Sequence, residues 1–213
     1  MFEFGALRFR PVEREDLKLL HDWENDYELM MYSRSRPMNS KSMAQLEQEY
    51  AEWVKDEKET RFIIEFADLK EAVGIARIEL GDWCYVRAAN VGTFIGKKNL
   101  WGKGLGLQIT TALLEMCFIL LNVERCGAGS VEYNYRAHKV LLECGFKKSG
   151  VERQSHFVSG KKWDDFYFDI LREEYLEIRL GLLKKVLGGK FEEYIKKSGP
   201  LSDTEGVPAA KPY

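Results

Sequence analysis

Hydrophobic and polar residues alternate with two different periods along the chain, and each change of period marks a predicted element. Apolar residues recur at every second position in segments that we predict as strands, over residues 6–10, 61–66, 73–80, 88–95, 129–133, 151–157 and 163–171. They recur at helical spacing over residues 15–32, 40–56, 107–121 and 137–143. This succession predicts a mixed sheet with helices on both of its faces.

The pattern changes again near the C-terminus, where Lys and Glu become frequent. Leucines and other apolar residues continue at helical spacing, and Gly188-Gly189 interrupts them, so we expect one or two further helices. We therefore predict three parts, with one domain over residues 1–174, a helical appendage over 175–197 and a flexible tail over 198–213. The tail is assigned because it carries three prolines and few apolar residues.

Composition narrows the class of protein. With 213 residues and 45% hydrophobic residues, the chain is most simply one α/β domain with a sizeable core. A net charge of −2 gives no general attraction to nucleic acid or to an anionic membrane, so neither is expected as a partner. No apolar run reaches membrane-spanning length, and no signal peptide is visible, so we expect a cytoplasmic protein. The four cysteines show no metal-ligand spacing, and no metal is expected.

The candidate chemistry begins with three alternating glycines, Gly102, Gly104 and Gly106, between a predicted strand and a predicted helix. Glycines at such a turn leave backbone N–H groups bare beside the positive end of the helix, and that combination holds phosphate. A nucleoside-triphosphate loop is excluded because Lys103 is followed by glycine rather than by Ser or Thr. The G-x-G-x-G spacing and its place in mid-chain argue against a dinucleotide loop. A glycine-rich turn without a ligand remains the alternative.

Two motifs resemble those of the GNAT superfamily of N-acetyltransferases. Residues 101–106 resemble its pyrophosphate loop, Q/R-x-x-G-x-G/A, with Trp101 at the first position. The W-G-K-G form looks like the RimJ/RimL-like branch. Asn134 and Ala137, followed after a short helix by Gly145-Phe146, resemble the second signature of the superfamily. The resemblance covers residues 7–174. It implies the GNAT fold, an α/β fold with a central, twisted, mostly antiparallel sheet in which two strands part in a V.

The resemblance also implies acetyl-CoA as co-substrate and assigns residues to it. The backbone near residues 94–96 would contact the pantetheine arm, and residues 102–107 would hold the pyrophosphate. Asn134 would offer its amide to the pantetheine, although capping the following helix is an alternative role for it. The residues expected at the cofactor are Phe94, Ile95, Gly96, Trp101, Gly102, Lys103, Gly104, Leu105, Gly106, Leu107, Asn134, Ala137 and Lys139.

The usual catalytic groups of such enzymes are absent from their usual places. Leu141 stands where many relatives have a Tyr acid, and Asn90 stands where a carboxylate often begins the first strand of the V. We therefore consider Glu79 as a base and Tyr133 as an acid, with Asp82 and Tyr167 as alternatives. For each of these residues a surface or core role remains open.

The resemblance predicts acetyl-CoA-dependent transfer of an acetyl group to a primary amine, either a protein N-terminus or a small amine. Arg34 and Arg36 would border the acceptor and could meet an anionic group on it. The alternatives are a non-catalytic acyl-CoA-binding sensor and an enzyme for a larger acyl donor. A homodimer is a further expectation, through the last strands or the appendage.

Overall fold

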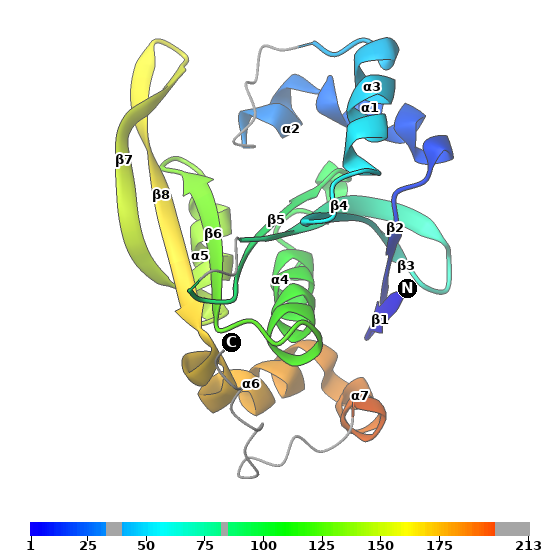
Figure 1. The fold of residues 1–213 in the computed structure, drawn as a ribbon, viewed down its shortest axis with the longest axis vertical. Helices are drawn as coiled ribbons and strands as arrows, with labels where there is room; N and C mark the ends of the chain where they lie inside the picture. Colours follow the sequence, from blue (N-terminus) through cyan, green and yellow to red (C-terminus); the bar gives the residue numbers. More distant parts are fainter. Residues whose placement is uncertain (33–39, 82–84, 199–213) are drawn as a thin grey trace.

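A mixed sheet organises the part of the chain that the computed structural model describes, which is residues 1–32, 40–81 and 85–198 (Figure 1). Its eight strands in these ranges lie in the order β1-β2-β3-β4-β5-β6-β8-β7. Neighbouring strands run antiparallel, except β5 and β6, which run parallel. In chain order the strands are β1 (Phe2–Phe4), β2 (Leu7–Pro11), β3 (Glu59–Phe66), β4 (Glu71–Leu80), β5 (Ala88–Ile95), β6 (Arg125–Val131), β7 (Lys147–Val158) and β8 (Lys161–Leu171).

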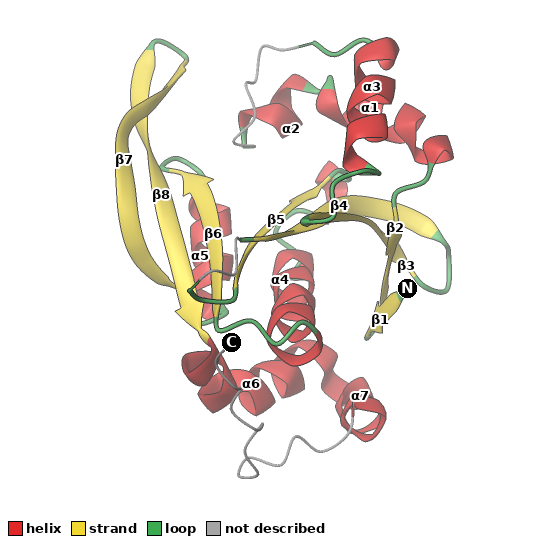
Figure 2. Cartoon of the chain, viewed as in Figure 1, coloured by secondary structure: helices red, strands yellow, loops and turns green. Residues whose placement is uncertain are grey.

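Helices cover both faces of the sheet, as the sequence predicts (Figure 2). One face carries α1 (Leu17–Glu24), α2 (Tyr27–Met31) and α3 (Met43–Trp53), and the other carries α4 (Leu105–Glu115) and α5 (Tyr135–Glu143). Within β3 and within β4, residues on opposite faces of the strand supply the two cores. Ile63 and Ile75 pack with the first set of helices, whereas Ile64 and Ile78 pack with α4.

The N-terminal region differs from the prediction in two ways. The helix predicted over residues 15–32 is wrong as one element, because the chain breaks between α1 and α2. Asp26 causes the restart, since its Oδ1 accepts hydrogen bonds from the backbone N–H groups of Glu28 and Leu29 and so caps α2. The sequence also missed β1, which forms a short hairpin with β2 in which Phe2 lies opposite Phe9.

The helix predicted over residues 107–121 is α4 followed by a π-helical turn, Met116–Leu120. At the junction lies Glu115, which is 1% exposed. Its carboxylate accepts two hydrogen bonds from Arg179, at 2.7 and 2.8 Å, and one each from the hydroxyls of Tyr175 and Tyr194. A buried carboxylate is tolerated because these four donors replace the water it lost.

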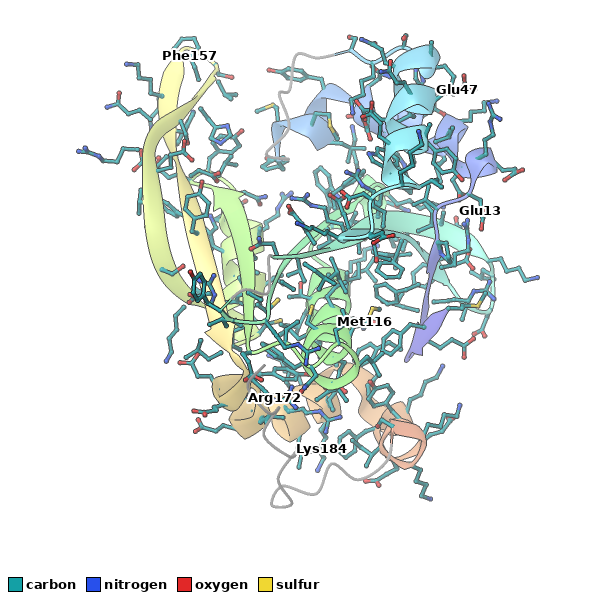
Figure 3. The ribbon with its side chains drawn as sticks, viewed as in Figure 1. Glu13, Glu47, Met116, Phe157, Arg172 and Lys184 are labelled. Carbon is teal, nitrogen blue, oxygen red and sulfur yellow. The ribbon has the colours of Figure 1, made fainter. Side chains whose placement is uncertain are left out.

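The donors to Glu115 come from the last two helices, α6 (Arg172–Leu187) and α7 (Phe191–Ser198). Leu182 and Leu183 of α6 also belong to the main core, which α4 shares. Arg172 and Lys184, labelled in Figure 3, mark the course of α6 beneath α4. Residues 199–213, most of the predicted tail, lie outside the described residues.

Candidate active site

Strands β5 and β6 run together for only three residues and then part. Ala88, Ala89 and Asn90 pair with Arg125, Cys126 and Gly127, whereas β5 continues to Ile95 and β6 to Val131 without further pairing between them. Each keeps its outer neighbour, β4 for β5 and β8 for β6. The inner backbone groups beyond Asn90 thus lose ladder partners, and those groups are free to bind a ligand. This parting is the V that the resemblance implies.

The glycine loop lies at the open end of the V and leads into α4. Gly102 and Gly104 have φ of +73° and +82°, a conformation that L side chains rarely adopt, and a Cβ on either would meet no atom within 4 Å. Gly104 is the N-cap of α4 and supplies no side chain to cap it, and the first turn carries no acidic residue. The first turn of α4 therefore lies beside open space on the Cβ side of both glycines, and its N–H groups form the positive end of the helix, which suits an anion site.

A cavity of about 550 Å³ joins the V to the glycine loop. Its walls come from the outer half of β5, the loop, the first turns of α4, the middle of β6 and the start of α5. Of the residues expected at the cofactor, those that line it are Phe94, Ile95, Trp101, Gly102, Gly104, Gly106, Leu107, Asn134, Ala137 and Lys139. The wall fits an elongated, partly apolar ligand with an anionic end, which describes the pantetheine and pyrophosphate of CoA.

Three of the expected cofactor residues lie off the cavity wall. The backbone N–H of Gly96 donates to the carbonyl of Val73 at 2.9 Å, and a Cβ on Gly96 would lie 2.1 Å from the indole of Trp23. Leu105 is buried in the core, and Lys103 is exposed. Gly96 thus serves packing, and Leu105 anchors the first turn of α4.

Trp101 and Asn134 hold the loop and α5 in place as well as lining the cavity. The indole N–H of Trp101 donates to the carbonyl of Ile95 at 2.9 Å. Asn134 caps α5, because its Oδ1 accepts from the N–H of Ala137 at 3.2 Å, and its Nδ2 donates to the carbonyl of Tyr32 at 3.1 Å. The Asn134 amide therefore performs the capping role that the sequence left open, and its contact with pantetheine stays a prediction.

Neither of the two expected catalytic side chains lines the cavity. Glu79 lies on β4 opposite Asn90, is 45% exposed and is 3.6 Å from Arg77. The Tyr133 hydroxyl donates to the carbonyl of Met31, and burial raises the pKa of Tyr133 above its ordinary value. Leu141, by contrast, does line the cavity, so its wall carries an aliphatic side chain at the place where the GNAT resemblance implies a tyrosine.

Arg34 and Arg36, expected at the acceptor, fall outside the described residues, as does Asp82. Sequence reasoning missed other wall residues, among them Tyr32, Thr110 and Leu113. For Thr110 and Leu113 a signal exists, since they follow Gly106 at helical spacing and share its face of α4. For Tyr32 no local signal exists, because only folding brings α2 beside the start of α5.

The residues that the structure describes show neither a membrane-spanning helix nor a metal site. None of their helices combines the length and apolar character that crossing a bilayer requires. In the same ranges no three His, Cys, Asp or Glu side chains gather in a way that would hold a metal ion.

The sequence over residues 6–147 matches the model of the acetyltransferase (GNAT) domain family. The chain belongs to this family. It is an N-acetyltransferase with the GNAT fold, and acetyl-CoA is its co-substrate, as predicted. The family match favours the enzyme over the non-catalytic CoA-binding module.

Similar proteins narrow the comparison further. A spermidine N(1)-acetyltransferase of Vibrio cholerae is 29% identical over 173 residues, which cover 81% of this chain and 96% of that protein. The enzyme of the same name from Escherichia coli K12 is 24% identical, covering 80% and 89%. The crystal structure of the Vibrio cholerae spermidine N-acetyltransferase with CoA and spermine superposes with a TM-score of 0.73 at 27% identity, covering 80% and 98%. These comparisons do not support the RimJ/RimL-like branch, because the proteins that this chain is similar to are named spermidine acetyltransferases.

Proposed function

We propose that this acetyltransferase acts on a primary amine of a small aliphatic polyamine. The similarity to spermidine acetyltransferases supports this acceptor class. The structural observation that carries the proposal is a row of polar side chains across the sheet where the V closes. Glu79 of β4 lies opposite Asn90 of β5, Asn90 opposite Gly127 of β6, and Gly127 opposite Asp169 of β8.

This row faces away from α4 and therefore away from the donor cavity. Glu79 lies four residues after Ile75 on the same strand, and Ile75 packs against α1–α3, so both point to that face. A Cβ on Gly127 would lie 2.4 Å from Oδ1 of Asn90, so the Asn90 amide extends across β6 on the same face. An amine approaching the V from this side meets two carboxylates and an amide oxygen, which suit a cationic acceptor.

Both carboxylates remain accessible to such an acceptor. Glu79 is 45% exposed and Asp169 is 26% exposed, and their nearest cations, Arg77 and Arg125, lie at 3.6 and 3.7 Å. These distances are too long for tight hydrogen-bonded pairs. A diffusible polyamine can therefore compete for the carboxylates.

The experiment compares release of the CoA thiol with spermidine, spermine, simple monoamines and short peptides with free N-termini. We expect the highest kcat/KM with a polyamine, and acetylation of the peptides in preference to polyamines would overturn the proposal. Glu79→Gln and Asp169→Asn should each raise the KM for spermidine about threefold with kcat nearly unchanged, because each removes one partly screened charge.

The matched control is Glu71→Gln, which removes a carboxylate of similar exposure, 47%, at the other end of β4. It should leave both kinetic constants unchanged. Glu79→Gln also tests the role of Glu79 as base. If kcat falls and the rise of rate with pH is displaced, then Glu79 removes the proton from the amine rather than binding a distant charge.

Self-association belongs to the same proposal. One solved Vibrio cholerae relative is described as a dodecamer, at a TM-score of 0.68. In this chain β7 is an edge strand, and Phe157 near the end of its hairpin is 72% exposed (Figure 3). An open edge strand that carries an exposed aromatic side chain favours pairing with another copy. Light scattering should find an oligomer that Phe157→Asp weakens, and a monomer at all concentrations would contradict this part.

A further inference from the structure

The cavity assigned to acetyl-CoA contains a buried hydroxyl, that of Thr110 on α4, which has no role in the site described so far. Thr110 is 4% exposed and lines the cavity wall. Its neighbour Thr111 behaves as helical threonines often do, because its hydroxyl donates to the carbonyl of Leu107 at 2.8 Å. The Thr110 hydroxyl makes no hydrogen bond to any described residue. It is therefore a hydrogen-bond donor available to a ligand in a largely apolar wall.

Several other side-chain donors on or beside this wall already make hydrogen bonds within the protein. The Thr93 hydroxyl donates to the carbonyl of Ile75 at 2.9 Å, and the indole of Trp101 donates to Ile95. The Asn134 amide is held as cap and donor, and the Tyr133 hydroxyl donates to the backbone of α2. The hydroxyl of Ser130 on β6 is also buried without a partner, but Ser130 does not line the cavity. Of the buried side-chain hydroxyls among the described residues that do line it, Thr110 is the one left for a ligand.

Thr110 also lies at the depth where the reacting end of the donor must lie. It follows the N-cap Gly104 by six residues, which is about 9 Å along a helix. Gly92, on the facing strand, precedes the end of β5 by three residues, about 10 Å along a strand. The phosphates at the glycine loop mark one end of the cavity, so both positions line its inner end, where the strands converge.

Packing of α4 against α5 brings Thr110 and Leu141 to neighbouring turns of the two helices. A Cβ on Gly106 would lie 3.4 Å from Val140, and the Thr111 hydroxyl lies 3.9 Å from the sulfur of Cys144. Thr110 falls between these two contacts, and so does Leu141, whose aliphatic side chain offers no hydrogen bond. Both side chains line the same cavity.

We propose that the Thr110 hydroxyl donates a hydrogen bond to the thioester sulfur as the sulfur leaves. In the reaction the amine nitrogen forms a bond to the acetyl carbon, and the carbon–sulfur bond breaks with its electron pair on sulfur. One proton leaves the amine to solvent, and one reaches the sulfur from solvent. Thr110 transfers no proton itself and instead stabilises the negative charge on sulfur, as preorganised donors do in water-poor sites.

The test compares Thr110→Val, which keeps the shape but removes the hydroxyl, with Thr110→Ser, which keeps the hydroxyl. Thr110→Val should lower kcat about tenfold or more, because a hydrogen bond to a charged group is lost, and Thr110→Ser should retain most activity. A readout independent of turnover is the pKa of the thiol of bound CoA, followed by the ultraviolet absorbance of the thiolate. Thr110→Val should raise this pKa by about one unit.

The matched control is Thr111→Val, which removes an equally buried hydroxyl of the same helix that does not line the cavity. It should leave the thiol pKa unchanged. Calorimetry with desulfo-CoA completes the test, since Thr110→Val should bind this sulfur-free analogue as wild type does. Equal loss of affinity for CoA and desulfo-CoA would overturn the proposal by showing a contact elsewhere on the pantetheine. An unchanged thiol pKa in Thr110→Val would overturn it as well.

Discussion

The buried carboxylate of Glu115 allows a quantitative test of how the C-terminal helices stabilise the cofactor helix. Arg179→Met removes both charge-assisted hydrogen bonds and leaves a carboxylate that is 1% exposed with only the tyrosine hydroxyls as donors. Removing one partner of a buried ion pair costs about 3–5 kcal/mol, and we expect a loss in this range in the free energy of unfolding. Urea unfolding followed by tryptophan fluorescence measures this loss.

The double variant Glu115→Gln, Arg179→Met provides the control. With the charge removed from both partners, the desolvation cost also disappears, so the double variant should lose less stability than Arg179→Met alone. The Gln amide oxygen can still accept from Tyr175 and Tyr194. If Arg179→Met costs less than about 1 kcal/mol, or if the effects of the single variants simply add, the reasoning about this network is wrong.

Three further predictions concern other parts of the fold. Burial and the neighbouring carboxylate raise the pKa of Tyr175 and Tyr194 above the ordinary tyrosine value of about 10. The stability that these hydroxyls contribute should therefore be fully present below pH 10 and should fall above it. A free energy of unfolding that stays constant to pH 12 in urea titrations would contradict this. Gly96→Ala should lower the free energy of unfolding by about 1–3 kcal/mol, because its new methyl group overlaps Trp23. Differential scanning calorimetry measures this loss, and an unchanged melting temperature would show that the packing there is looser than described. Ser42→Ala should cost about 1 kcal/mol in chemical unfolding, because it removes the cap of α3, whereas a neutral effect would show that water replaces the cap.

The sequence predicted β5, the glycine loop and the helix that follows because their patterns are local, whereas the strand predicted over residues 129–133 overlaps β6 only at 129–131. Strand β5 spans the same residues, 88–95, that the alternation indicates, and the glycine loop separates it from a helix as expected. Glycine spacing and helix capping follow from neighbouring residues alone, so Gly104 and Asn134 could be assigned from short motifs. The same locality explains why ten of the expected cofactor residues line the cavity.

The rest of the site depends on contacts between distant segments, which a pattern does not contain. The backbone of Gly96 was expected to contact the cofactor, yet its N–H donates to β4 and its α-carbon packs against Trp23. Glu79 was expected as a base, and only the pleat of the folded strand shows that it faces away from the donor cavity, so its catalytic role stays a prediction. Thr110 showed no motif at all, and its position became informative only when α4 and β5 enclosed the same space.

The most direct test of the central claim is the affinity for CoA of Gly104→Val, measured by isothermal titration calorimetry beside Gly160→Val. Both glycines have positive φ, +82° and +76°, and open space where a Cβ would lie, so the two substitutions impose similar backbone strain. Only Gly104 lines the cavity, because Gly160 lies in the turn between β7 and β8. We predict that Gly104→Val loses most of its CoA affinity while Gly160→Val binds like wild type. Wild-type affinity in a folded Gly104→Val would contradict the assignment of this cavity to acetyl-CoA.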